Sequence, residues 1–207
     1  MKRLIVAAVL SSITSLNAQS LIARHSAVLD LTAPDVVRTS GTIGTEGGVT
    51  STAKRQSIGL EVRFVSSSQN DLHLGDQFTY ELEVKNSGTQ PVDFPFSADL
   101  ASFLPGPNTT VASIYLQARR QDQRDVAFGS MMLAGSDSVP GSLHRLDVGD
   151  ALLIRVPSGV SLDGDDFIEF STRGAVPVNV VLTFNGNEKV WWIPAVSKNS
   201  LQFVIRR

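Results

Sequence analysis

The clearest pattern in the chain lies in residues 76–86, where apolar and polar residues alternate. The apolar positions are Phe78, Tyr80, Leu82 and Val84. A period of two places successive side chains on opposite sides of an extended backbone. The segment is therefore predicted to be a β-strand with one buried and one solvated face. We interpret the solvated face as scaffold that carries no chemistry.

Turn residues stand on both sides of this strand. A Gly-Asp pair at residues 75–76 leads into it, and an Asn-Ser-Gly sequence at residues 86–88 follows it. Glycine and residues with short polar side chains favour turns because of their backbone preferences. A second alternating run occupies residues 92–97, and the two segments are predicted to pair as a hairpin.

Further strand-like segments follow along the chain, separated by turn residues. They are residues 58–65, 92–97, 111–119, 126–133, 146–156, 166–173, 176–184, 189–193 and 201–205. The polar residues 120–125 are predicted to form the charged tip of a hairpin. Residues 146–156 repeat the order found at residues 72–80: an apolar residue, then Gly-Asp, then a strand. Strands at this spacing, without a sustained 3.6-residue period, predict an all-β fold, an antiparallel sandwich.

The N-terminus has the parts of a secretory signal peptide. Lys2 and Arg3 precede an apolar run at residues 4–16, and Ala18 offers a small residue for cleavage. We therefore predict a signal peptide at residues 1–18 and an extracytoplasmic location, periplasmic or secreted. The alternative is an anchor that is never cut, but the run is shorter than the roughly 20 residues that a spanning helix needs. We expect no membrane span after cleavage.

Residues 19–56 are predicted to be a flexible lead-in, because residues 39–52 are rich in Gly, Ser and Thr and offer little to bury. One short strand is indicated within it by Ala27, Leu29 and Leu31. The glycine-rich run separates that strand from the rest, so it is also a candidate for completing the sheet of a neighbouring molecule. Residues 57–207 are assigned to a single β-sandwich domain.

Composition narrows the function classes. The chain contains no cysteine, so its stability must come from its core, and a lipid anchor on a cysteine is excluded. Loss of Lys2 and Arg3 with the signal peptide leaves a net charge of about −4. A weakly acidic chain without a basic stripe argues against nucleic acid as a partner.

The sequence offers weak signals for catalysis. His25, His73 and His144 are far apart in the sequence, and no serine stands in a Gly-x-Ser-x-Gly context. Zinc would need at least three ligands to converge. An enzyme would require a pocket in which His73 or His144 meets a serine or a carboxylate at hydrogen-bond distance. We therefore expect no enzyme and no catalytic residue.

An acidic loop is the candidate for a metal site. Asp163, Asp165 and Asp166 stand close together between predicted strands. Calcium prefers six to eight oxygen ligands, and such loops supply carboxylates. The alternative is an ordinary solvated turn, in which Asp and Gly are favoured for their backbone preferences, with no cofactor bound.

Trp191 and Trp192 are adjacent, so in a strand they point to opposite faces. A two-residue turn at residues 185–186 or 186–187 places Trp191 on the core face in either case. Trp192 then shares the outer face with Asn179 and Thr183. An exposed Trp is a platform for a sugar or a contact for a protein partner. In the alternative, the lead-in, a loop or the second sheet covers it.

The pattern of residues 74–92, with its Gly-Asp entry, alternating strand and Asn-x-Gly exit, resembles bacterial extracytoplasmic immunoglobulin-like β-sandwich domains. The resemblance implies an immunoglobulin-like fold and a non-catalytic interaction or structural module of the envelope or secretome, with a protein or glycan partner. Two alternatives stay open. One is a carbohydrate-binding module that uses Trp192, and the other is an inhibitor of secreted proteases that uses the loop at residues 103–108.

Overall fold

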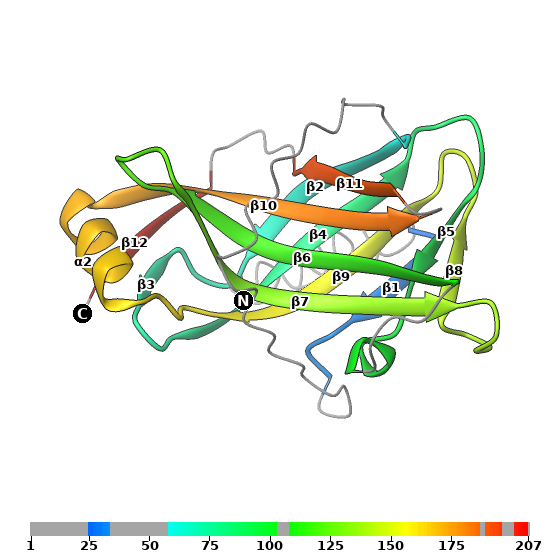
Figure 1. The fold of residues 1–207 in the computed structure, drawn as a ribbon, viewed down its shortest axis with the longest axis horizontal. Coiled ribbons are helices and arrows are strands. Elements are labelled where there is room, and N and C mark those ends of the chain that lie inside the picture. Colours follow the sequence, from blue (N-terminus) through cyan, green and yellow to red (C-terminus); the bar gives the residue numbers. More distant parts are fainter. Residues whose placement is uncertain (1–24, 34–57, 103–107, 187–188, 196–200, 207) are drawn as a thin grey trace, which may run out of the picture.

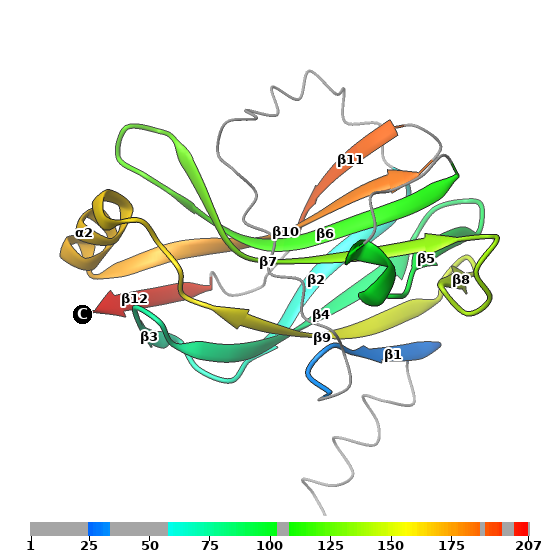
Figure 2. The same cartoon turned by 60° about the horizontal axis from the view of Figure 1, so that its bottom comes forward.

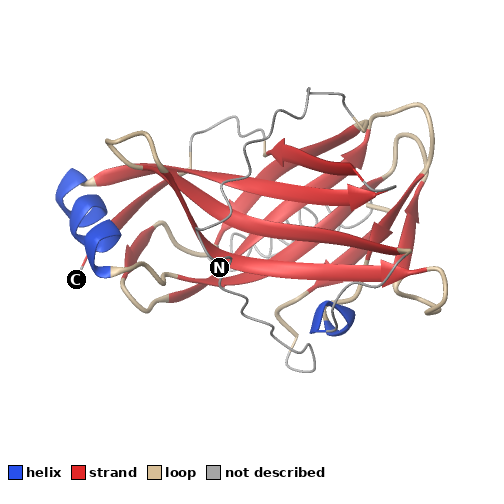
Figure 3. Ribbon diagram, in the orientation of Figure 1, coloured by secondary structure: helices blue, strands red, loops and turns tan. Residues whose placement is uncertain are grey.

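The computed structural model describes residues 25–33, 58–102, 108–186, 189–195 and 201–206. The elements are β1 (Ala27–Asp30), β2 (Leu60–Ser67), β3 (Asp71–His73), β4 (Gln77–Asn86), β5 (Val92–Pro95), η1 (Asp99–Ser102), β6 (Thr109–Arg119), β7 (Asp125–Ser136), β8 (Leu143–Leu146), β9 (Ala151–Gly159), α2 (Gly164–Arg173), β10 (Ala175–Gly186), β11 (Lys189–Pro194) and β12 (Gln202–Arg206). Strands dominate (Figures 1 and 3), so the all-β class is confirmed.

The described strands form two larger sheets and one small one. The first has the order β1-β9-β4-β2, the second has the order β3-β12-β10-β6-β7 with β11 on β10, and β5 pairs with β8. The two larger sheets lie as layers across one another (Figure 2). Two pairs, β1 with β9 and β12 with β3, are parallel. The sheets are therefore mixed, and the prediction of a purely antiparallel architecture was wrong at these two pairs.

The core lies between the layers. All four apolar residues of β4 are buried, as the alternation predicts. Phe78 meets Phe203 of β12 edge to face, with ring centroids 5.3 Å apart. Phe94 of β5 stacks on Phe184 of β10 at 5.9 Å. Aromatic pairs in such geometries add to the stabilisation that burial provides, so they fix how the sheets face one another.

The Gly-Asp motif before β4 forms a tight turn. The Asp76 amide donates to the His73 carbonyl at 3.0 Å, and the Asp76 carboxylate accepts from the His73 amide at 2.7 Å. Gly75 has a φ of +88°, a conformation that favours glycine. The Gly75 amide donates to the Val160 carbonyl at 2.9 Å, and the Val160 amide donates to the Asp76 carbonyl at 2.9 Å. The turn is thereby joined to the end of β9.

The repeated motif before β9 forms the same turn. The Asp150 amide donates to the Asp147 carbonyl at 3.0 Å, and the Asp150 carboxylate accepts from the Asp147 amide at 3.3 Å. Gly149 has a φ of +93°. The Gly149 amide donates to the Asn86 carbonyl at 2.8 Å, and the Asn86 amide donates to the Asp150 carbonyl at 2.9 Å. Because β4 and β9 are antiparallel, the repeat gives this central pair a local two-fold relation.

The predicted hairpin between residues 76–86 and 92–97 was wrong. β5 pairs with β8 instead. Both edges of β4 are occupied, one by β2 and the other by β9, so no edge remains for β5. The hairpin with the charged tip at residues 120–125 is confirmed as the antiparallel pair β6–β7.

The strand predicted at residues 166–173 was wrong, because this segment is the helix α2. The Asp163 carboxylate caps the helix by accepting from the Asp166 amide at 2.8 Å. Phe167 and Phe170 are both buried, which is the spacing of one helix face. The helix ends at Gly174, whose φ is +76°. Among the described residues, no helix is long and apolar enough to cross a membrane.

The short strand expected within the lead-in is present as β1. It belongs to the four-stranded sheet of its own chain, so this part of residues 19–56 is not a flexible tail. Residues 1–24, with the predicted signal peptide, and residues 34–57 lie outside the described part of the chain.

Candidate functional site

β1 lies on the outer edge of β9 and forms the candidate site. The two strands run parallel, with Ala27 opposite Leu152 and Asp30 opposite Arg155. Beyond this register, the Ser26 amide donates to the Ala151 carbonyl at 2.8 Å, and the Leu31 amide donates to the Arg155 carbonyl at 3.0 Å. Figure 2 shows β1 beside β9 at the margin of the layer. The edge of β9 therefore already holds an extended segment.

Alternate side chains of this segment face the core. Leu31 is 1% exposed, and Ala27 and Leu29 pack partly buried against the core. These positions are two residues apart, as a strand with one inward face requires. The apolar side of β1 therefore packs against the core, most deeply at Leu31.

A first group of polar contacts joins the start of β1 to β4. The His25 Nε2 atom lies 2.9 Å from the Glu83 Oε2 atom, and the Arg63 guanidinium donates to the same oxygen at 2.9 Å. The His25 side chain is 1% exposed. Burial alone would raise the pKa of Glu83, but the hydrogen bonds from His25 and Arg63 outweigh it and lower that pKa.

A second group of polar contacts joins the end of β1 to β9. Arg155 donates to Asp30 at 3.2 Å and to Glu81 at 3.0 Å. The Thr32 hydroxyl and amide also donate to the Asp30 carboxylate, at 2.5 and 3.0 Å. The Thr32 hydroxyl is the largest cause of the lowered pKa of Asp30, and Arg155 adds to it. Glu81 and Glu83 come from the solvated face of β4, so the interpretation of that face as scaffold without chemistry missed the residues that hold β1.

Acidification is expected to weaken the docking of β1. The pKa values of Glu83 and Asp30 lie below their ordinary values of 4.5 and 3.8. Their charged forms therefore stabilise the docked edge above those ordinary values, and this contribution is lost as pH falls through the lowered values. Hydrogen exchange, corrected for intrinsic rates, should show the amides of β1 losing protection below about pH 4.5.

Amides of β6 and β10, in the other large sheet, are the internal reference for this titration. The Glu83→Gln variant should lose much of the pH dependence while it keeps a hydrogen-bond acceptor for Arg63. Equal loss of protection in β1 and β10 over the same pH range would contradict this expectation.

A shallow hollow of about 340 Å³ lies beside the end of β1. It is lined by Thr32, Ser66, Ser67, Ser68, Thr79, Tyr80, Glu81 and Arg155. Its polar groups serve one another: Ser66 donates to Glu81 at 2.9 Å, and the Ser68 hydroxyl accepts from the Thr79 amide at 3.0 Å. The hollow is therefore a polar rim to the β1 site. The hydroxyls of Ser66 and Ser68 make internal hydrogen bonds, whereas the buried Tyr80 hydroxyl has no partner among the described residues.

The pairing of β10 with β11 shows on which face of the sheet Trp192 lies. Trp192 is opposite Thr183, so the two residues share one face of the β10–β11 ladder, as the sequence predicted. The turn differs from both expected positions, because Gly186 pairs with Lys189. Asn179 is exposed and Thr183 is partly buried. The side chain of Trp192 lies outside the described part of the chain, so its role as a binding platform stays a prediction.

Two of the three predicted calcium ligands have other partners. Asp163 caps α2, Asp165 is exposed, and Asp166 is buried against the Arg120 guanidinium. Within the described ranges, no three His, Asp or Glu side chains form a cluster suited to a metal ion. The described contacts therefore give the calcium hypothesis no support.

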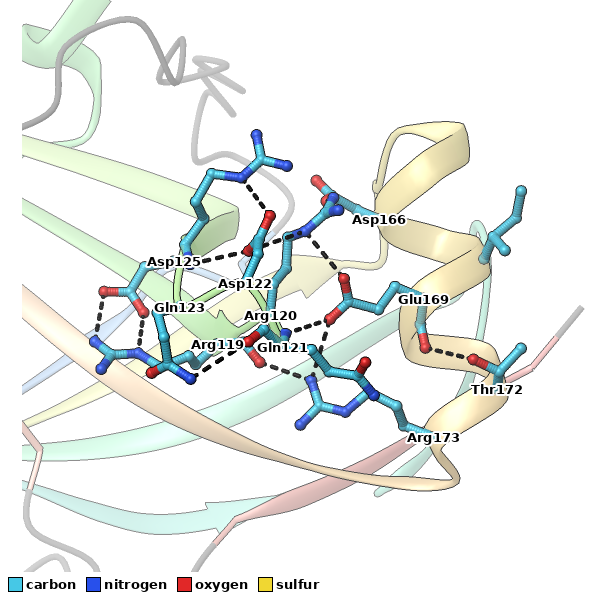
Figure 4. A network of polar contacts seen from close by, with 12 residues as sticks. Arg119, Arg120, Gln121, Asp122, Gln123, Asp125, Asp166, Glu169, Thr172 and Arg173 are labelled. Atoms are coloured by element: carbon cyan, nitrogen blue, oxygen red, sulfur yellow. Dashed lines mark hydrogen bonds and ion pairs between the residues drawn. The ribbon is translucent and has the colours of Figure 1, made fainter.

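Figure 4 shows the network to which Asp166 belongs. Arg120, at the tip of the β6–β7 hairpin, also pairs with Glu169 of α2 at 3.0 Å. Glu169 accepts from the Gln121 amide at 2.8 Å, and Arg173 donates to the Arg119 carbonyl at 2.7 Å. These contacts fasten the hairpin tip to the helix, so the acidic loop serves the fold.

The other two histidines, His144 and His73, also have hydrogen-bonding neighbours. His144 Nε2 lies 3.3 Å from the Ser26 hydroxyl, and His73 Nδ1 lies 3.4 Å from Asp76. The Ser26 hydroxyl donates its proton to the Ala151 carbonyl at 3.1 Å. The hydroxyl has one proton for these two acceptors, and the longer contact to His144 has no fixed donor, so it does not identify a nucleophile with a histidine base. The contact adds a third tie between the start of β1 and the sheet.

No protein-family model and no curated protein matches the chain. Among solved structures, 68% of the chain is similar to the Pseudomonas fluorescens alkylpurine DNA glycosylase AlkC bound to DNA, with 10% identity and a TM-score of 0.31. The sporulation control protein Spo0M from Bacillus subtilis is similar over 68% of the chain, with 14% identity and a TM-score of 0.35. The chain spans 31% and 50% of the lengths of these two proteins. At such TM-scores, the similarities carry no argument about fold or activity.

Proposed function

We propose that the chain is an exported, non-catalytic interaction module that binds an extended protein segment along the edge of β9. One observation carries the proposal: residues 27–30, far in sequence from β9, add to that edge in parallel. In strand addition, main-chain hydrogen bonds provide affinity, and pockets for alternate side chains provide specificity. β1 occupies the edge in this way, so its sequence indicates which segments the edge can bind.

The sequence of β1 defines the chemistry of the bound segment. Small or apolar side chains are needed at the positions of Ala27, Leu29 and Leu31, which face the core. A carboxylate is needed at the position of Asp30, because it meets Arg155. The proposed ligand is therefore a protein strand of alternating pattern with one acid near its end.

The proposal includes the immunoglobulin-like class and an extracytoplasmic location. The class is supported by the Gly-Asp turns that open both central strands, and the location by the pattern of residues 1–18. The glycan-binding and protease-inhibitor alternatives depend on the side chain of Trp192 and on residues 103–107. Both lie outside the described part of the chain, so no described contact favours either alternative.

A labelled peptide of residues 25–32 tests the proposal. The Leu31→Asp variant of the full chain should release its own β1, because a carboxylate replaces a fully buried side chain. Fluorescence anisotropy should then show saturable binding of the peptide to this variant. The wild type should bind at least about tenfold more weakly, because its own strand competes at an effective concentration in the millimolar range.

Leu74→Asp is the matched control variant, since Leu74 is 49% exposed and lies away from β1. It should behave as the wild type. A peptide with Ser in place of Leu29 and Leu31 should not bind. If the folded Leu31→Asp variant binds neither peptide, or binds both equally, the edge of β9 is not a strand-binding site.

A further inference from the structure

The two strands that follow one another in the chain, β1 and β2, lie at opposite edges of one sheet. Three strand spacings of about 4.8 Å separate them, which is roughly 14 Å. Residues 31–59 join them, and a chain of that length reaches about 100 Å when extended. The covalent connection can therefore span much more than the distance between the two edges. Its length allows β1 to reach the sheet of another molecule as well as its own.

The contacts that hold β1 do not depend on its own connection either. They are made to β9, to Glu83 of β4 and to His144 of β8, all within residues 58–206. A second copy of the chain offers the same atoms at the same positions. Exchange of the segment between two copies would thus conserve each of these hydrogen bonds and ion pairs.

We propose that residues 25–32 of one copy fill the β9 edge of another copy, so that the chain assembles by strand exchange. The inference rests on the proposed function, in which the β9 edge binds a strand, and it names a second copy as the partner. Reciprocal exchange gives a closed dimer. One-way exchange leaves one β9 edge and one β1 segment free. Each of these can bind a further copy, so the assembly can grow.

The extent of exchange follows from competition between the two sources of the strand. A tethered segment acts at an effective concentration of about 1–10 mM, so protein at about 0.1 mM should show roughly 1–10% exchange. A tenfold rise in protein concentration should raise that fraction about tenfold until it saturates. A brief exposure to acid followed by neutralisation at high concentration should speed the approach to that fraction, because Asp30 and Glu83 lose their charges in acid and β1 is released.

The absence of cysteine from the chain allows a direct test. Val28 and Leu153 are register partners across β1 and β9, at a separation that a disulfide can bridge. Full-length Val28→Cys and Leu153→Cys variants, carrying different tags, are mixed at high concentration and oxidised. A disulfide between the two tags can form in this register only when β1 of one molecule lies on β9 of the other.

Asn179→Cys, an exposed site on β10, replaces Leu153→Cys in the control mixture and reports random collisions. The Val28/Leu153 mixture should give at least about tenfold more hetero-disulfide than this control, and should reach this level sooner after an acid pulse. The double variant Val28→Cys/Leu153→Cys in one chain shows that both cysteines are tolerated and can pair. If it closes only within single chains and the mixture matches the control, strand exchange is refuted.

The two proposals fail in different ways. Peptide binding to Leu31→Asp without intermolecular disulfides removes the second copy as partner but keeps the β9 edge as a strand-binding site. Failure of peptide binding in the folded variant removes both proposals.

Discussion

Asn86→Ala is expected to lower the free energy of unfolding by about 3 kcal/mol, because it removes three hydrogen bonds and leaves the carbonyl of the buried Leu146 without this partner. Asn86 is fully buried. Its side-chain amide donates to the carbonyls of Gln90 at 2.9 Å and Leu146 at 3.0 Å, and its side-chain oxygen accepts from the Gly88 amide at 3.0 Å. One side chain thus joins the turn after β4 to the end of β8. Urea denaturation followed by circular dichroism measures the loss.

Asn179→Ala is the matched control for Asn86→Ala, because Asn179 is an exposed strand residue. It should change stability by less than about 0.5 kcal/mol. Asn86→Asp should cost more than Asn86→Ala, since it loses both donated hydrogen bonds and places a charge in a buried site. Equal stability of the Asn86→Ala and Asn179→Ala variants would show that the turn does not depend on this network.

Local patterns could be read from the sequence where a single strand or turn decides the structure. The alternation around Tyr80 predicts β4 and its buried face, since a half-buried strand needs only a period of two. The repeated Gly-Asp pair predicts a turn before each central strand, because Gly75 and Gly149 have backbone conformations that favour glycine. Both features depend on residues that are neighbours in sequence.

Pairing between distant segments could not be read in this way. The strand with which β5 pairs depends on whether β4 still has a free edge. The sequence of β5 does not carry that information. The parallel pairing of β1 with β9 joins segments that lie far apart in the chain, and no turn sequence signals it. Helix α2 was missed because Asp166, Phe167 and Phe170 make one buried face in only ten residues, too short a run to separate its period from an alternating one.

The candidate site was missed for the same reason. Glu81 and Glu83 occupy the solvated positions of an amphipathic strand, where acidic side chains are ordinary. Their role depends on Arg155 of β9, which contacts Glu81 across the sheet, and on His25, which reaches Glu83 only when β1 is docked. The apolar alternation at Ala27, Leu29 and Leu31 was the available signal, and it indicated a strand without indicating its partner.

Gly129→Ala is expected to destabilise the fold by about 3 kcal/mol, for two separable reasons. Gly129 has a φ of +59°, next to an irregularity in the ladder between β6 and β7. A left-handed conformation costs a residue with a Cβ atom about 1–2 kcal/mol. An added Cβ would also collide with the hydroxyl of Ser158 on β9, and overpacking of this kind costs about 1–3 kcal/mol. The missing side chain of Gly129 thus lets β7 approach β9 across the core.

A double-mutant cycle separates the collision from the backbone cost. The Ser158 hydroxyl is buried without a hydrogen-bond partner among the described residues, so Ser158→Ala alone should change stability by less than about 1 kcal/mol. In the Gly129→Ala/Ser158→Ala protein the collision is absent, and the loss should fall to about 1 kcal/mol. Gly141→Ala measures the backbone cost separately, because Gly141 has a φ of +78° and open space around a Cβ. The double variant and Gly141→Ala should therefore lose similar stability in urea denaturation. If Ser158→Ala rescues nothing, the contact between β7 and β9 does not set the need for glycine at this position.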